Sequence, residues 1–128
     1  MANKVSSPIK EAIRASAILT GDYVAGTVVN VQGMNTVTLE IAFTIGSSTG
    51  VDIKVEFSAD GTNYFQMPQY TQSGSVSLYS ADVIRLAATG TIRPTLGTVN
   101  ADTMRVSAKA IGTTTGTLLA ISSLKAAL

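Results

Sequence analysis

Two segments in the first half of the chain alternate between hydrophobic and polar residues. In residues 36–45 the hydrophobic positions are Val37, Leu39, Ile41, Phe43 and Ile45. In residues 51–58 they are Val51, Ile53, Val55 and Phe57. Successive side chains of a β-strand point to opposite faces, so this period of two predicts strands that bury one face. A loop rich in glycine and serine, residues 46–50, separates them, and we expect an antiparallel hairpin.

A tight turn is expected directly after the second segment. Ser58 and Ala59 lead into Asp60 and Gly61. Glycine supplies the positive φ that such turns require, and the aspartate side chain can cap the turn. The chain should then reverse and bring Tyr64 and Phe65 back beside Phe57. This pattern indicates structure and carries no chemistry.

The rest of the chain also favours short strands. We expect them at residues 23–31, 64–66, 76–79, 83–87 and 103–111, separated by turns that contain glycine or proline. No interior segment has a convincing helical pattern. Residues 21–128 are therefore predicted to form one all-β domain, an antiparallel β-sandwich with jelly-roll-like connections.

Both ends of the chain differ from this pattern. In residues 1–20, Ser7 precedes Pro8, and Ile9, Ala12 and Ile13 recur at helical spacing. One interpretation is a short helix or a loose leader, and the other is an N-terminal arm that reaches a neighbouring subunit. Residues 118–128 are apolar, but their pattern does not decide between helix and strand.

Composition bounds the class of protein. The chain has 128 residues, 45% hydrophobic but only 5% aromatic, so aliphatic side chains must fill the core. Charged residues are only 13%, and a surface rich in threonine and serine suits sheets that other subunits cover. The net charge of +1 gives no reason to expect nucleic acid. Without a signal-peptide run or a membrane-spanning segment, we expect a protein made in a cytoplasm and without a membrane partner.

The residues that most often carry catalysis are missing. Histidine and cysteine are both absent, which removes the commonest general base and the usual ligands of zinc, haem and iron–sulfur clusters. Asp52 and Glu56 share a strand face, but they lie about 13 Å apart, too far for a glycosidase pair. Asp60 with Asn63 offers calcium too few ligands. We expect no catalytic residues, no metal and no cofactor, and therefore no enzyme.

The segment from Val55 to Tyr64 resembles a pattern of small β-sandwich proteins in tailed-bacteriophage particles. In that pattern a strand leads into Ser-x-Asp-Gly and an aromatic residue, usually tryptophan, and a later strand carries arginine. Ser58, Asp60, Gly61 and Tyr64 match, with tyrosine in place of tryptophan, and residues 83–86 hold the arginine. The resemblance covers roughly residues 35 to 110. It implies a capsid decoration or cement protein in the virion, which binds the lattice of the major capsid protein as a homo-oligomer, often a trimer.

Apolar residues near the two termini are the expected interface, because they would be costly if left in water. The candidates are Ile9, Ile13, Leu118, Leu119, Ile121, Leu124 and Leu128. Two other functions stay open. A tail or head-completion protein would form rings, whereas a carbohydrate-binding or host-recognition module would need an exposed aromatic platform.

Overall fold

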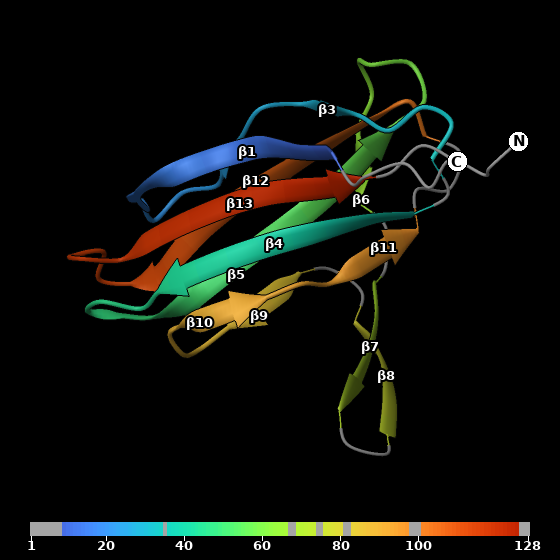
Figure 1. Cartoon of the computed structure of the whole chain (residues 1–128). Coiled ribbons are helices and arrows are strands. Elements are labelled where there is room, and N and C mark those ends of the chain that lie inside the picture. Colours follow the sequence, from blue (N-terminus) through green and yellow to red (C-terminus); the bar gives the residue numbers. More distant parts are fainter. Residues whose placement is uncertain are drawn as a thin grey trace, which may run out of the picture.

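All regular elements of the described chain are β-strands. The computed structural model describes residues 9–34, 36–66, 69–73, 76–80, 83–97 and 101–125. Two antiparallel sheets pack face to face, and a separate two-stranded hairpin extends away from them (Figure 1). The predicted all-β antiparallel sandwich is confirmed. Within the described residues, no helix is long and apolar enough to cross a membrane.

Each sheet is built from strands that are distant in sequence. The first sheet contains β1 (Ile9–Ile18), β4 (Thr36–Thr44), β10 (Gly90–Ile92), β11 (Thr95–Gly97) and β13 (Leu118–Lys125). Its order is β1-β13-β4-β10, and β11 also pairs with β4. The second sheet contains β2 (Val24–Ala25), β3 (Val29–Asn30), β5 (Ser48–Ser58), β6 (Phe65–Gln66), β9 (Ile84–Leu86) and β12 (Thr103–Gly112). Its order is β2-β12-β5-β6, with β3 on β12 and β9 on β5. The separate hairpin consists of β7 (Gln69–Ser73) and β8 (Val76–Ser80).

The core lies between the inner faces of the two sheets. The alternating positions of β4 are buried as expected, and Phe43 is only 2% exposed, although Ile45 beyond the strand is only partly buried. The matching positions of β5 and β12 complete the core: Val51, Ile53, Val55, Phe57, Met104, Val106, Ala108 and Ala110. The periodicity therefore predicted correctly which face of each long strand is buried.

The expected hairpin between residues 36–45 and 51–58 is wrong. β4 lies in the first sheet, where it pairs with β13, β10 and β11, whereas β5 lies in the second sheet, where it pairs with β12, β6 and β9. The loop between them carries the chain from one sheet to the other. Alternation shows which side of a strand is buried, and it is equally satisfied when two strands face each other across a core.

Of the interpretations left open for residues 1–20, the short helix is wrong for residues 9–18, because these residues form β1. An arm that reaches a neighbouring subunit stays a prediction. β1 pairs antiparallel with β13, and its register shifts twice, between Ala12 and Arg14 and between Arg14 and Ala17. Such irregularities interrupt the period of two, and the apolar residues then recur at spacings that resemble a helix. Within the apolar C-terminal segment, residues 118–125 form β13. Residues 1–8, with the Ser7–Pro8 motif, lie outside the described residues.

Two loops that change sheets meet at one end of the sandwich. One joins β4 to β5, and the other joins β12 to β13. The backbone N–H of Ser47 donates to the carbonyl of Thr115 at 2.9 Å, and the Thr117 hydroxyl donates to the carbonyl of Ile45 at 2.9 Å. Gly46 has a φ of 55°, and a Cβ added to it would lie 2.4 Å from the carbonyl carbon of Gly116. This close approach requires glycine.

We expect Gly46→Ala to destabilise the fold more than the same change at Gly33. Gly33 also has a positive φ, 79°, but a Cβ there would meet nothing within 4 Å. Gly33→Ala should therefore cost only the conformational strain, about 1 kcal/mol. Gly46→Ala must also push the two loops apart, so it should lower the free energy of unfolding at least about twice as much. Urea unfolding measures both, and equal losses would contradict the proposed role of the close approach.

Candidate interaction surface

The turn after β5 is held by its own side chains. One carboxylate oxygen of Asp60 accepts hydrogen bonds from the backbone N–H groups of Asn63 at 2.7 Å and Thr62 at 2.8 Å, and from the Ser58 hydroxyl at 2.9 Å. The other oxygen accepts from the Asn63 side-chain amide at 2.7 Å. The Ser58 hydroxyl also accepts from the N–H of Gly61, whose φ is 77°. Because the turn itself engages both carboxylate oxygens, the arrangement stabilises the reversal of the chain.

These hydrogen bonds also shift the titration of Asp60. The pKa of its carboxyl lies far below the ordinary value, chiefly because of the backbone N–H of Asn63, then that of Thr62, then the side chains of Asn63 and Ser58. All these donors favour the charged carboxylate.

Tyr64 connects this turn to β12. The guanidinium carbon of Arg105 lies 4.1 Å from the centre of the Tyr64 ring, and the tyrosine hydroxyl lies 3.3 Å from the Thr103 hydroxyl. Arg105 also pairs with Glu56 at 3.1 Å. The structure therefore brings the sequence-predicted turn residues Ser58, Asp60, Gly61 and Tyr64 together, in contacts within the chain.

The second sheet carries paired charges on its outer face. Arg85 donates two hydrogen bonds to Asp52, at 2.7 and 2.8 Å, and the Asp52 side chain is only 7% exposed. The hydrogen bond from Arg85 lowers the Asp52 pKa, against the opposing effect of burial. Lys54 and Lys109 both approach the Tyr23 ring, with their Nζ atoms 4.5 and 4.8 Å from its centre. The carboxylates of Asp52 and Glu56 thus form ion pairs with arginines, and Lys54 and Lys109 lie over the Tyr23 ring.

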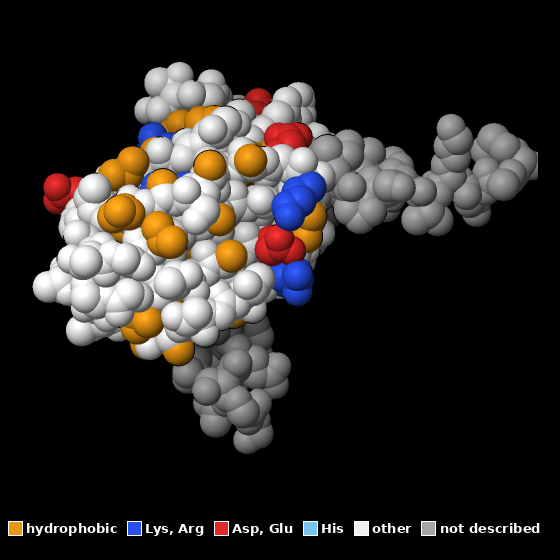
Figure 2. Space-filling view, turned by 60° about the vertical axis from the view of Figure 1, so that its left-hand side comes forward, with side chains coloured by type: hydrophobic (Ala, Val, Ile, Leu, Met, Phe, Trp, Pro, Cys, Tyr) orange, Lys and Arg blue, Asp and Glu red, His pale blue; other side chains and the backbone are white. Residues whose placement is uncertain are grey.

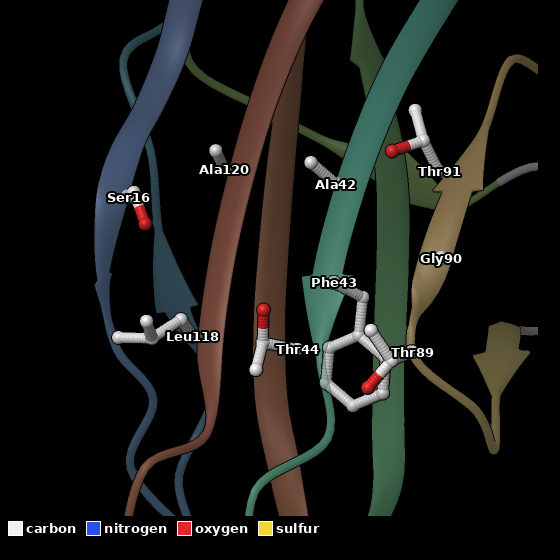
Figure 3. Close-up of a pocket in the computed structure, with 9 residues that line it drawn as sticks. All are labelled: Ser16, Ala42, Phe43, Thr44, Thr89, Gly90, Thr91, Leu118 and Ala120. Atoms are coloured by element: carbon white, nitrogen blue, oxygen red, sulfur yellow. The ribbon is translucent and has the colours of Figure 1, made fainter.

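The outer face of the first sheet is different, because it holds a hollow that no charged side chain lines. A shallow hollow of about 340 Å³ lies there, between β1, β13, β4 and the start of β10 (Figure 3). Its lining residues are Ser16, Ala42, Phe43, Thr44, Thr89, Gly90, Thr91, Leu118 and Ala120. Figure 2 shows a surface on which hydrophobic side chains are scattered among uncharged ones, with Lys, Arg, Asp and Glu side chains toward its margins. We call the hollow and its lining the first-sheet hollow.

No charged side chain is among the lining residues of the hollow, but Arg14 of β1 lies close to them. Its guanidinium donates to the carbonyls of Leu119, Ala17 and Ile18 at 3.1 to 3.3 Å. Other charged side chains of this sheet meet at Glu40, outside the hollow. Lys10 donates to one carboxylate oxygen of Glu40 at 2.9 Å, and Arg93 donates to the other at 3.0 Å. The hydrogen bonds from Lys10 and then Arg93 lower the pKa of Glu40. The described residues contain no group of three histidine, cysteine, aspartate or glutamate side chains that could hold a metal ion. Because no charged side chain lines the hollow, its surface is suited to contact with uncharged groups.

The predicted interface residues are only partly at the surface. Ile13, Leu119 and Ile121 lie in the core, at most 2% exposed, so they are not available to a partner. Leu118 and Leu124 are partly exposed on the outer face of the first sheet. The side chain of Ile9 and all of Leu128 lie outside the described residues.

Sequence reasoning missed most of the hollow and the most exposed hydrophobic residues. Ala42 and Thr44 could have been found, because the alternation in β4 already placed them on the outer face. Ile18 is 61% exposed and Phe65 is 66% exposed. Phe65 was expected to return beside Phe57, and its backbone does pair with Phe57, but its side chain stays in solvent.

Comparison with known proteins indicates the fold. No family model matches the chain, and no curated protein matches its sequence. The SPBc2 prophage-derived protein YomS has a similar structure, with a TM-score of 0.59, 13% identity and 97% of both chains covered. A chain of Bacillus endospore appendage pili has a TM-score of 0.46, 13% identity, and 100% of this chain and 95% of that chain covered. A chain of the T13 IBDV viral particle has a TM-score of 0.49, 8% identity, and 98% and 33% covered. Of these three, the likeness to YomS alone has a TM-score above 0.5, and at 13% identity it shows a shared fold.

The Asp60 turn makes stability depend on pH in a defined direction. The pKa of Asp60 in the folded state is below its unfolded-state value of about 4. The carboxylate's contribution to the free energy of unfolding is therefore fully present above the unfolded-state pKa, and it is lost as the pH falls toward the folded-state pKa. Asp60→Asn should therefore lower the melting temperature most near about pH 6, and the gap to wild type should narrow by about pH 3.

Thermal melts across this pH range measure the gap. Asp22→Asn, at an exposed aspartate outside the turn, is the matched control. An Asp60→Asn gap that stays constant with pH would show that the carboxylate's charge has no part in holding the turn.

Proposed function

We propose that this chain is a structural protein of a virus particle, and specifically a decoration protein that binds the lattice of the major capsid protein. The uncharged lining of the first-sheet hollow is the observation that carries the proposal. The fold shared with a prophage-derived protein supports it, as does the resemblance of the Ser58–Tyr64 turn to the phage pattern. In this role the protein acts by contact and catalyses no reaction.

We also propose that the sandwich has jelly-roll connections. In the described part of the chain, eleven strands make up the two sheets. Three pairs of short strands each share one position beside a common neighbour: β2 with β3, β6 with β9, and β10 with β11. Merging these three pairs leaves eight positions, four in each sheet. Numbered along the chain, the first sheet reads 1-8-3-6 and the second reads 2-7-4-5. This order corresponds to the two Greek keys of a jelly roll, an architecture that recurs in viral capsid proteins.

The first sheet has the physical properties that a lattice contact needs. Ala42 and Ala120 have short side chains, which let another backbone approach closely and lose little conformational freedom on binding. Thr44 and Thr91 can form hydrogen bonds at the rim. No charged side chain lines the hollow, so covering it does not strip water from an ion. A protein that binds only the assembled shell stabilises that shell by mass action.

The decisive experiment compares particles made with and without the chain. Particles from cells that encode the chain should contain it in a fixed ratio to the major capsid protein, by quantitative mass spectrometry after a density gradient. Particles that lack the chain should still assemble but release their genome at a lower temperature, because the stabilising contacts are missing. Added purified chain should restore the release temperature.

Two alanine variants test which face binds. Ala42→Glu places a charge in the first-sheet hollow and should abolish restoration, whereas Ala25→Glu, at an exposed alanine of β2, should restore normally. Particles that cannot assemble without the chain would assign it to the shell or to head completion, and a chain found only in the free fraction would refute the particle role.

A further inference from the structure

Arg14 is a charged residue at the edge of the first-sheet hollow. Its Nε donates to the carbonyl of Leu119 at 3.1 Å, and its Nη2 donates to the carbonyls of Ala17 and Ile18 at 3.3 and 3.1 Å. The residues on either side of Leu119 line the hollow, and so does Ser16, directly before Ala17. The guanidinium is therefore fixed beside the surface that we assign to the capsid contact.

The irregular backbone of β1 supplies the acceptors that Arg14 uses. The register of β1 against β13 shifts between Ala12 and Arg14 and again between Arg14 and Ala17. Where extra residues interrupt a ladder, some carbonyls lose their strand partner and need another donor. Arg14 stands between the two irregularities and donates to carbonyls of both strands. Its planar fork is therefore held in one orientation, so it loses little conformational freedom when a partner binds.

One nitrogen of this guanidinium has no partner within the described residues. Nη1 carries two N–H donors, and neither meets an acceptor there. In the same part of the chain, no carboxylate forms an ion pair with Arg14. The side chain is partly buried, and this burial lowers its pKa. A partly desolvated positive charge, held by carbonyls alone, thus lies beside the hollow.

A partner that covers the hollow and this edge would also remove water from Nη1. An uncharged surface there would leave charged donors unpaired, which is costly at an interface. A carboxylate would instead accept a short, charge-assisted hydrogen bond and neutralise the charge. The best partner surface is therefore uncharged over the hollow and acidic at Arg14.

We propose that Arg14 binds an aspartate or glutamate side chain of the major capsid protein and thereby fixes the orientation of this chain on the lattice. Complementary charges at the edge of a contact suppress wrong partners and fix its register. This inference rests on the particle role proposed above, and it names the chemistry of the partner at the same surface.

The sign of a charge introduced next to Arg14 tests the pairing. Ser16 is exposed and lines the hollow. Ser16→Glu adds a carboxylate that competes for Arg14 and repels the partner's carboxylate, whereas Ser16→Lys adds a long side chain of opposite charge. We expect Ser16→Glu to bind particles that lack the chain at least about tenfold more weakly than Ser16→Lys does. A surface that excluded charge of either sign would penalise both variants equally.

Arg14→Gln removes the charge but keeps an amide that can donate to the surrounding carbonyls. It should weaken binding by about tenfold or more, as expected for an arginine covered in a contact. The matched control is Arg93→Gln, at an arginine that pairs with Glu40 outside the hollow, and it should bind as wild type does. Melting temperatures verify that each variant folds.

Cosedimentation with particles that lack the chain, over a concentration series, measures these affinities. Equal affinities of Ser16→Glu and Ser16→Lys would overturn the pairing with Arg14 and leave the particle role standing, and so would wild-type binding by Arg14→Gln. A wild type that does not bind the particles would overturn both. If Arg14→Gln does not fold, the two Ser16 variants alone decide, because both keep the arginine and its three carbonyl acceptors.

Discussion

The structure depends on the mutual burial of two inner faces that are almost entirely aliphatic. With aromatic residues at 5% of the chain, Val, Ile, Leu, Met and Ala must fill the space between the sheets. Each buried methylene contributes only about 0.8 kcal/mol, so the sheets must lie close along their whole length. Long loops between the two sheets would hold the sheets together less closely at their ends. The loops at Gly46 and Gly116 therefore cross between sheets in a few residues and touch each other, which only glycine permits at Gly46.

The features that were predictable from sequence are those that a few neighbouring residues determine. The buried faces of β4 and β5 follow from the period of two, and the Asp60 turn follows from a short run of residues that hydrogen-bond one another. Strand partners do not follow, because the same alternation suits two strands in one sheet or in facing sheets. β1 was misassigned for a related reason: its two register shifts erase the period that would have marked it as a strand.

The candidate site was less predictable than the fold. Candidate interface residues were chosen by their hydrophobicity, and this selected Ile13, Leu119 and Ile121. These three side chains are buried in the core and cannot contact a partner. The first-sheet hollow is instead lined by small and uncharged residues from four separate parts of the chain, near residues 16, 43, 90 and 119. No local pattern relates these parts, and only the pairing of β1, β13, β4 and β10 brings them together. What the sequence did show was the low share of charge that makes such a surface possible.

The contrast between the two outer faces supports the proposal that a contact is made through the first sheet. On the second sheet, Asp52 is held by Arg85 and Glu56 by Arg105, and covering these groups would cost the remaining hydration of the arginines. Arg85 in particular is 64% exposed and would lose most of its water. On the first sheet Lys10, Glu40 and Arg93 meet outside the hollow, and no charged side chain lines it. Arg14, close to the hollow, already donates to the carbonyls of Leu119, Ala17 and Ile18. For an equal area of contact, covering the hollow of the first sheet would therefore cost less desolvation free energy than covering the paired charges of the second sheet.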